Sequence, residues 1–364
     1  MLSTENIQSA EVFGKEGHYF LLALNENMEI IDTVSDAFSA TQNRIRIVKA
    51  PKGLEVFESN KSLGKFSALS LVSANSTSVF AIKGSKRERW YRGALEFTPA
   101  NHGICVVNVV ELEEYVAGVV ESEGGHYPAF EYFKAQAVLV RTFAIKNLNK
   151  HVSEGYNLKD DVTSQVYHGM ARHKYSANIL SAVLETRDTI LVDGECQPIL
   201  AVFHANSGGQ TANSEEAWSK AIPYLRSKPD AFSPKGPSAK WEKKILKSDF
   251  YSYFASQLGT QADDIELQKA ILNMPSSRRL SVFEYNKRRL PLKLVRTRFN
   301  LRSAFFGVEE EGNYLILKGK GYGHGVGMAQ DGAMVMADFG YCYKEILNYY
   351  YSEIVLEKRS MVWP

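Results

Sequence analysis

One carboxyl group stands apart from the other acids of the chain. Glu123 closes the mainly apolar run VAGVVESE over 116–123 and directly precedes a Gly-Gly pair. A carboxyl that leaves an apolar helix at the base of a cleft loses hydration, which raises its pKa. Such a group can hold a proton near neutral pH and donate it, so Glu123 is a candidate general acid. Three earlier acids instead fit the solvated start of a helix, where carboxylates complement the dipole: Glu111, Glu113 and Glu114.

Two histidines lie beside glycines. His324 is the centre of GKGYGHGVGM over 319–328, whose alternating glycines match neither the dinucleotide-binding nor the P-loop spacing. Alternating glycines allow positive φ and close backbone approach, so the segment is either a tight turn or a loop that holds His324 in a cleft. His204 precedes a Ser-Gly-Gly turn at 207–209, where the complete G-x-S-x-G pattern of a serine nucleophile elbow is absent. A metal site on the two histidines lacks an identifiable third ligand.

A basic stretch covers 278–302, where Glu284 is the only acid. It forms either a solvated face of strands or a lane for an anionic polymer. Its nine cations are Arg278, Arg279, Lys287, Arg288, Arg289, Lys293, Arg296, Arg298 and Arg302.

The elements that must position these residues are strands first and helices later. β-branched and aromatic residues with Gly and Asn punctuation predict strands at 18–24, 44–48 and 78–82, and two more near 93–97 and 104–110. The segment 128–148 predicts a helix that is apolar nearly all round and therefore buried. Its polar exceptions must find partners or face a cleft: Lys134, Gln136 and Arg141.

The remaining chain completes an α+β protein. We predict a β-rich N-terminal domain over 1–90 and a mixed α/β domain over 91–364, built on the central buried helix and carrying an inserted subdomain at about 240–305. Further elements are expected as a helix at 171–185, strands at 190–192 and 200–204, a loop at 229–239, helices within 240–290, a strand at 314–318 and a helix from 328.

Composition narrows the class of protein. The 364 residues carry a formal net charge of +2, which argues against a dedicated nucleic-acid binder. The chain has no run of 18 apolar residues and no visible signal peptide, so no transmembrane segment is expected. The three cysteines are far apart and form no C-x-x-C pair, which predicts neither a disulfide framework nor a cysteine zinc site.

Four segments together resemble one family. They are VVESE with the helix motifs KAQA and RTFA (119–144), DVTSQVYHG (161–169), HANSGGQT with a following Trp and PYL (204–225), and GYGHGVGMAQDGA (321–333). Their order and spacing are similar to those of the stage II sporulation protein D (SpoIID/LytB, amidase enhancer) family over about residues 95–355.

The resemblance implies a peptidoglycan lytic transglycosylase that cuts glycan strands stripped of stem peptides, outside the cytoplasm and without a cofactor. Glu123, eleven residues before Lys134, matches the family's catalytic acid. Basic residues such as Arg141 or Arg302 are candidates to pair with the lactyl carboxylates of such strands. The implied substrate-binding residues are Lys134, Gln136, Arg141, Gln165, Tyr167, His204, Ser207, Gly208, Gly209, His324, Gly325 and Gln330.

Two departures from the family pattern keep alternatives open. Gly124-Gly125 replaces a usual Met-Pro, which favours as the alternative a non-catalytic glycan-binding protein that recruits or activates a cell-wall amidase. Ala205, Asn206 and Ser207 stand where some relatives carry zinc-binding cysteines, so no structural zinc is expected. A metal-dependent wall hydrolase using His204 and His324 is the third hypothesis.

Overall fold

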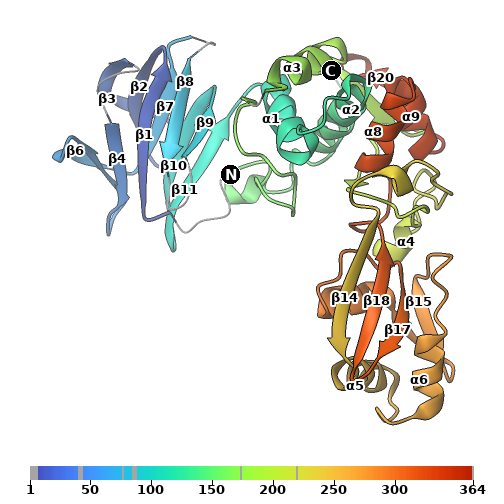
Figure 1. Cartoon of the computed structure of the whole chain (residues 1–364). Coiled ribbons are helices and arrows are strands. Elements are labelled where there is room, and N and C mark those ends of the chain that lie inside the picture. Colours follow the sequence, from blue (N-terminus) through green and yellow to red (C-terminus); the bar gives the residue numbers. More distant parts are fainter. Residues whose placement is uncertain are drawn as a thin grey trace. The chain divides into compact units, whose positions relative to one another are not determined.

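The structure is a computed structural model, and it divides the chain into two compact units. Unit 1 comprises residues 1–128 and 140–187, and unit 2 comprises residues 129–139 and 188–364. Helices and antiparallel sheets occur together, which confirms the predicted α+β class (Figure 1). The residues that the structure describes are 7–39, 44–75, 78–83, 88–172, 174–218 and 220–362.

Unit 1 begins with two antiparallel sheets, so its β-rich start is confirmed (Figure 1). One has the order β6-β5-β4-β1-β8-β9 and the other β11-β10-β7-β2-β3. Tyr19 of the second sheet packs edge-on against Phe80 of the first, with ring centroids 5.8 Å apart. The strands are β1 Ser9–Glu16, β2 His18–Leu24, β3 Ile30–Ser39, β4 Arg44–Lys49, β5 Leu54–Glu58, β6 Lys61–Phe66, β7 Ala68–Ser73, β8 Val79–Lys83, β9 Glu88–Tyr91, β10 Ala94–Ala100 and β11 Gly103–Val109.

Burial alternates along the strands because successive side chains point to opposite faces. In β1, for example, Ala10, Val12 and Gly14 are buried while their neighbours are not. Fully buried Leu21 and Phe97 belong to the same core. Period-two burial of aromatic and aliphatic residues is what made these strands predictable.

Three helices follow the sheets. α1 Leu112–Gly124 packs against α3 Ser176–Glu185, which begins five residues later than predicted. A short 3₁₀ helix covers Val152–Glu154. α2 Phe130–Lys146 is buried along most of its length, as predicted, although Pro128 lies before it and not at its first turn. Its residues up to Leu139 belong to unit 2.

The elements of unit 2 around the histidines are short. β13 Phe203–His204 pairs in parallel with β19 Met328–Ala329, so the two histidine-bearing segments are hydrogen-bonded neighbours. α8 Gln330–Asp338 follows β19 directly. The other elements here are β12 Thr189–Val192, α4 Ser214–Ala217, a 3₁₀ turn Ser233–Lys235, α9 Tyr343–Tyr350, β20 Val355–Lys358 and α10 Arg359–Val362.

The predicted helical character of 240–290 is only partly right. This region begins with a strand, β14 Lys240–Leu246, which pairs along its whole length with β18 Tyr314–Lys320. Lysines interrupt its apolar residues, so the strand pattern was weak in sequence, and it is the partner strand that fixes it. The other elements are α5 Lys247–Leu258, α6 Ile265–Leu272, β15 Val282–Tyr285, β16 Arg288–Pro291, α7 Leu292–Arg298 and β17 Phe306–Glu311.

This region has its own core. Phe250 and Phe254 of α5 lie with ring centroids 4.7 Å apart, and Leu315 and Leu317 of β18 join the same cluster. Among the residues that the structure describes, no helix has both the length and the apolar character needed to cross a membrane. Three thiols are free, at Cys105, Cys196 and Cys342.

Candidate functional site

The end of α1 clamps a loop of unit 1 through three consecutive side chains. Glu123 accepts a hydrogen bond from the Val166 amide at 3.0 Å, and Ser122 accepts one from the His168 amide at 3.1 Å. Glu121 accepts bonds from the Arg172 amide at 2.9 Å and from a serine hydroxyl of α3. The helix end and the loop 165–172 therefore fix one another, and Glu123 is the member nearest the Gln165–Tyr167 segment.

Glu123 is partly buried, and its electrostatics follow from that placement. Burial raises the pKa of its carboxyl above the ordinary value, and the Val166 bond opposes the rise only in part. The carboxyl lies close enough to Tyr115 that its charge, after burial, helps to raise the pKa of that phenol. A half-buried carboxyl with a raised pKa is what a general acid requires.

Gln165 and Tyr167 are buried beside this carboxyl. The Tyr115 hydroxyl donates to Gln165 Oε1 at 3.2 Å, and the Tyr167 hydroxyl donates to Asn108 Oδ1 at 2.8 Å. The amide nitrogen of Gln165 has no hydrogen-bond partner within the described parts of the chain. Tyr167 therefore supports the site by packing, with its ring 5.0 Å from that of Tyr115.

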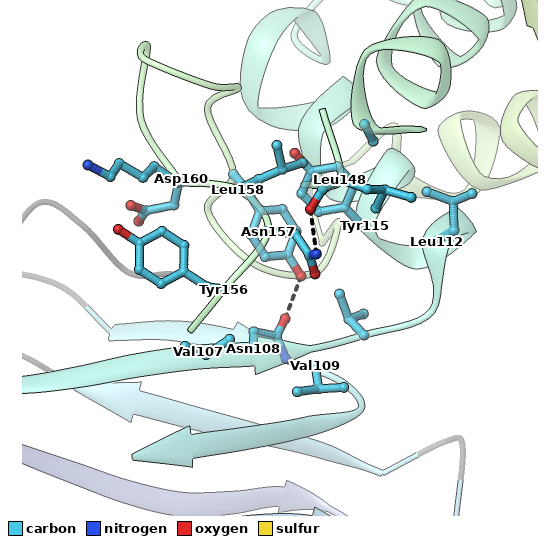
Figure 2. Close-up of a pocket in the computed structure, with 14 residues that line it drawn as sticks. Val107, Asn108, Val109, Leu112, Tyr115, Leu148, Tyr156, Asn157, Leu158 and Asp160 are labelled. Atoms are coloured by element: carbon cyan, nitrogen blue, oxygen red, sulfur yellow. Dashed lines mark hydrogen bonds between the residues drawn. The ribbon is translucent and has the colours of Figure 1, made fainter. Parts of the chain in front are cut away.

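Tyr115 and Tyr167 also line a mostly apolar pocket of about 250 Å³ (Figure 2). Val107, Val109 and Leu112 point into it from the end of β11 and the start of α1. Tyr156 and Asn157 enter from the loop that follows α2. Its charged lining residues are Lys159 and Asp160, and Asp160 pairs with Arg89 at 2.6 Å. Tyr115 also belongs to its wall and connects it to the Glu123 neighbourhood.

Arg141 is fully buried in unit 1 and forms an ion pair. Its guanidinium donates to both carboxylate oxygens of Glu113, with the shortest contact 2.5 Å, and to the Val183 carbonyl. Glu113 does lie in the first turn of α1, as predicted, but it is not simply a solvated acid, because it pairs with a buried cation 28 residues away. Arg302, the other basic residue considered for substrate contact, is exposed and lies over the ring of Tyr322.

Lys134 and Gln136, the other two polar exceptions predicted on α2, lie in unit 2. Lys134 pairs with Glu131 at 2.8 Å and lies over the Phe130 ring. Gln136 is fully buried, and its amide has no hydrogen-bond partner among the residues described. Gln330, the first residue of α8, donates to the Tyr132 hydroxyl of α2 at 3.3 Å.

His204 and His324 are neighbours in unit 2, with ring centroids 5.4 Å apart. His324 accepts a bond from the Val326 amide at Nδ1 and donates from Nε2 to the Phe203 carbonyl. His204 donates from Nδ1 to the Val326 carbonyl at 3.1 Å. Both nitrogens of His324 are thus used by the backbone, so ligation of a metal there requires breaking one of these bonds.

Both histidines are held neutral. Burial, and next the positive charge of Arg296, lower the pKa of His324 to about 4. Burial lowers the pKa of His204 well below its ordinary value, and the neighbouring His324 adds to this. Neither imidazole therefore carries a transferable proton near neutral pH beyond the N–H that it already donates.

The alternating glycines make room for this arrangement. Gly323 has φ +108°, and a Cβ there would lie 2.8 Å from the Cβ of His204. Gly325 has φ +87°, and a Cβ there would lie 2.7 Å from Nη1 of Arg279. Both residues occupy a left-handed backbone region that favours glycine. The segment is thus both a tight turn and the support that holds His324 at a pocket wall.

The Ser-Gly-Gly turn is fixed by buried acids that the sequence did not single out. Ser207 is fully buried and donates to Asp230 Oδ2 at 2.7 Å, while Gly209 donates its amide to the Ser207 hydroxyl. Asn206 donates to Asp331 at 2.8 Å and accepts from the Gly208 amide. Ser207 is therefore part of a structural network; its partners lie 23 and more residues away, beyond the reach of local sequence patterns.

Site residues thus gather in two groups, one in each unit. Glu123, Gln165, Tyr167 and Arg141 belong to unit 1. Unit 2 contains Lys134, Gln136, His204, Ser207, Gly208, Gly209, His324, Gly325 and Gln330. His324 also lines a pocket of about 340 Å³ together with Trp218 and three cations of the basic stretch.

Comparison with known proteins identifies relatives of this chain. The model of the stage II sporulation protein family matches residues 100–192. Stage II sporulation protein D of Bacillus subtilis (strain 168) is 33% identical over 258 residues, covering 67% of this chain and 74% of that protein. The same-named protein of Bacillus amyloliquefaciens is 33% identical over 273 residues, covering 71% and 76%. The amidase enhancer of B. subtilis (strain 168) is 25% identical over 285 residues, covering 64% and 39%.

The chain belongs to the stage II sporulation protein D family. The matched segment 100–192 contains Glu123 and the loop that its carboxylate fixes. The prediction of the family from four separate motifs is therefore confirmed.

Proposed function

We propose that this protein is a lytic transglycosylase that cleaves peptide-stripped glycan strands of peptidoglycan, with Glu123 as its general acid and base. The observation that carries the proposal is the Glu123 carboxyl itself: partly buried, with a raised pKa, and held by the Val166 amide at 3.0 Å. In unit 1 it has the environment of an acid that keeps its proton until a leaving group needs it.

One carboxyl is sufficient for this reaction because the nucleophile belongs to the substrate. Protonated Glu123 donates its proton to the glycosidic oxygen, and the bond between that oxygen and C1 of the muramic residue breaks. The C6 hydroxyl of the same sugar then attacks C1, and the Glu123 carboxylate accepts its proton. An anhydromuramic end forms, no water is consumed, and the acid is regenerated. Hydrolytic glycosidases, by contrast, generally need two carboxylates.

We assign the other family-motif residues to substrate binding or to support of the site. The Gln165 amide nitrogen is a buried donor next to the segment that fixes Glu123, suited to a sugar oxygen or to the developing charge. The unit 2 residues from Lys134 to Gln330 named above are proposed to bind glycan within their own unit. Arg141 and Tyr167 act by holding the walls, because their polar groups already bond Glu113 and Asn108.

A second candidate function is a glycan-binding partner of a cell-wall amidase. It is favoured by one observation: a relative with 25% identity bears the name amidase enhancer. This candidate predicts strand binding that does not depend on the proton of Glu123. In either case the substrate places the protein outside the cytoplasm, in contact with the wall.

The test is a product analysis. Wild-type protein and Glu123→Gln are incubated with peptidoglycan strands from which an amidase has removed the peptides, and the products are read by mass spectrometry. We expect anhydromuramic fragments from the wild type alone. Strand binding by both proteins without fragments would transfer the assignment to the amidase partner.

A further inference from the structure

The pocket at His324 is a positively charged site whose three cations lie outside the family motifs. It lies within unit 2 and measures about 340 Å³, within the range of small-ligand sites. It is lined by the glycine-rich segment, α4, Trp218 and α7. The residues that matter for its chemistry are Glu216, Trp218, Arg279, Lys293, Arg296 and His324.

Three cations face a single carboxylate in this pocket. Arg279, Lys293 and Arg296 line it together with Glu216, while His324 is neutral because its pKa is lowered to about 4. None of the three cations forms an ion pair within the described ranges of the chain. Glu216 accepts a hydrogen bond from Asn213 at 2.9 Å instead. The pocket therefore has three positive charges against the one carboxylate of Glu216, a net excess of positive charge.

Main-chain carbonyls hold these cations in place. Arg279 donates to the carbonyls of Gln210 and Ser207 at 3.1 and 2.9 Å. Lys293 donates to the carbonyl of Ala217 at 3.1 Å, and Arg296 to that of Leu301 at 3.4 Å. Carbonyls orient the side chains but do not neutralise them, so a bound anion would gain from charges that are already positioned.

Burial also favours anion binding by the two arginines. It lowers the pKa of Arg279 to about 10 and lowers that of Arg296, which means that their charged forms are poorly hydrated. A partly desolvated guanidinium binds a carboxylate more strongly than one in open water, and its planar fork matches two carboxylate oxygens.

An exposed aromatic face stands beside the charges. Trp218 is 39% exposed and its ring centroid lies 5.2 Å from that of His324. Such a face suits the apolar side of a sugar ring. A ring that carries a carboxylate would use both features of the pocket at once.

We propose that this pocket binds the lactyl carboxylate of a muramic acid residue, with the sugar ring against Trp218 and the carboxylate at Arg296 and Lys293. The inference rests on the proposed function, because that function supplies the strand. It adds a physical reason for selecting stripped strands: a stem peptide converts the lactyl carboxylate into a neutral amide, which the cations no longer attract.

The experiment measures binding and not cleavage, so that the inference and the proposed function can fail separately. Glu123→Gln protein is titrated with three probes of equal length: peptide-stripped strands, the same strands with their carboxyl groups reduced to alcohols, and a chito-oligosaccharide. Loss of a charged hydrogen bond predicts binding to stripped strands about 10- to 100-fold tighter than to the other two. Equal binding of all three probes would overturn the inference even if wild-type cleavage were established.

Substitutions on α7 test whether the preference for carboxylate-bearing strands arises in this pocket. Arg296→Gln in the same background should bring binding of stripped strands close to that of the reduced strands and leave chito-oligosaccharide binding unchanged. Arg298→Gln is the matched control, since it removes the same charge from the same helix at an exposed position outside the pocket. Equal losses for both variants would reduce the effect to general charge attraction and contradict the pocket. Stronger competition by inorganic phosphate than by lactate would contradict the carboxylate assignment.

Discussion

Burial shifts pKa values both around Glu123 in unit 1 and around the two histidines in unit 2, but the chemical consequences differ. Burial raises the pKa of Glu123 and lowers those of His204 and His324, so both neighbourhoods favour the neutral form. A neutral carboxyl keeps a proton that it can donate. A neutral imidazole has already lost the extra proton, and His324 uses its remaining N–H on the Phe203 carbonyl.

Glu123 can therefore act as an acid, whereas His204 and His324 have a structural role. Unit 1 contains the group suited to proton transfer, whereas the histidines of unit 2 organise backbone beside a cationic pocket. This structural role also weighs against a metal-dependent hydrolase on the two histidines, because Val326 and Phe203 already bond both nitrogens of His324. Four substitutions test the contrast, from the largest expected effect to the smallest.

Replacing Glu123 should have the largest effect on activity. Glu123→Gln keeps the shape and the Val166 bond but removes the proton, so the cleavage rate should fall about 10²- to 10⁴-fold. Glu121→Gln is the matched control, because its carboxylate bonds the Arg172 amide and Ser176 on the same helix end. Cleavage rates on stripped strands provide the measurement. Similar losses for both variants would mean that the clamp as a whole matters and not the acid.

The buried ion pair of unit 1 should dominate stability instead. Arg141→Met leaves Glu113 without its cation and empties a fully buried site, so the free energy of unfolding should fall by about 3 kcal/mol. The double variant Arg141→Met with Glu113→Leu should regain most of this loss, since neither charge then remains unpaired. Urea unfolding of the three proteins measures both effects. No recovery in the double variant would show that the packing of Arg141, and not its charge, is what the unit needs.

Local patterns predicted the parts of the molecule whose cause is local. Period-two burial gave β2 at 18–24, and an apolar surface nearly all round gave the buried helix α2. The glycines around His324 were also interpretable, because positive φ and close approach are properties of a few consecutive residues.

Contacts between distant residues account for what the sequence did not reveal. Glu113 looked like a solvated acid until Arg141 was found beside it, and Ser207 gave no sign of its bond to Asp230. β14 lies in a region that the sequence predicts to be helical, because its lysines obscure a strand that only pairing with β18 makes evident. The sequence shows the pocket cations only as members of a basic stretch. That they line one pocket depends on how the region folds.

Substitution of Gly325 tests how closely the backbone of unit 2 packs against Arg279. Gly325→Ala forces a left-handed φ on alanine and places its Cβ against Arg279, whereas Gly340→Ala imposes the same φ of +87° in open space. Backbone strain is shared, at about 1–2 kcal/mol. Gly325→Ala should therefore cost roughly 1–3 kcal/mol more, from displacement of the guanidinium. Thermal or urea unfolding compares the pair, and equal destabilisation would show that the contact with Arg279 is easily relaxed.

The smallest effect is a pH dependence that belongs to unit 2. His324 has a folded-state pKa of about 4 against an ordinary value of 6.5, because of burial and then the charge of Arg296. Its contribution to stability is therefore present above about pH 6.5 and is lost as the pH falls toward 4, since the unfolded chain takes up the proton first. His324→Gln retains a donor and an acceptor but does not titrate, whereas His204, Arg279 and Arg296 stay in place in both proteins.

The comparison is made by urea unfolding at about pH 7 and about pH 5. Wild-type protein should lose more unfolding free energy between the two conditions than His324→Gln does, with the remaining loss shared by His204. Glu123→Gln should behave in the opposite sense: a raised pKa destabilises the ionised carboxyl, so this variant should be more stable than wild type near pH 7 and lose that advantage as the pH falls through the raised pKa. If both variants followed the wild type at each pH, neither group would be neutral by virtue of the fold, and the contrast between the acid of unit 1 and the support of unit 2 would lose its physical basis.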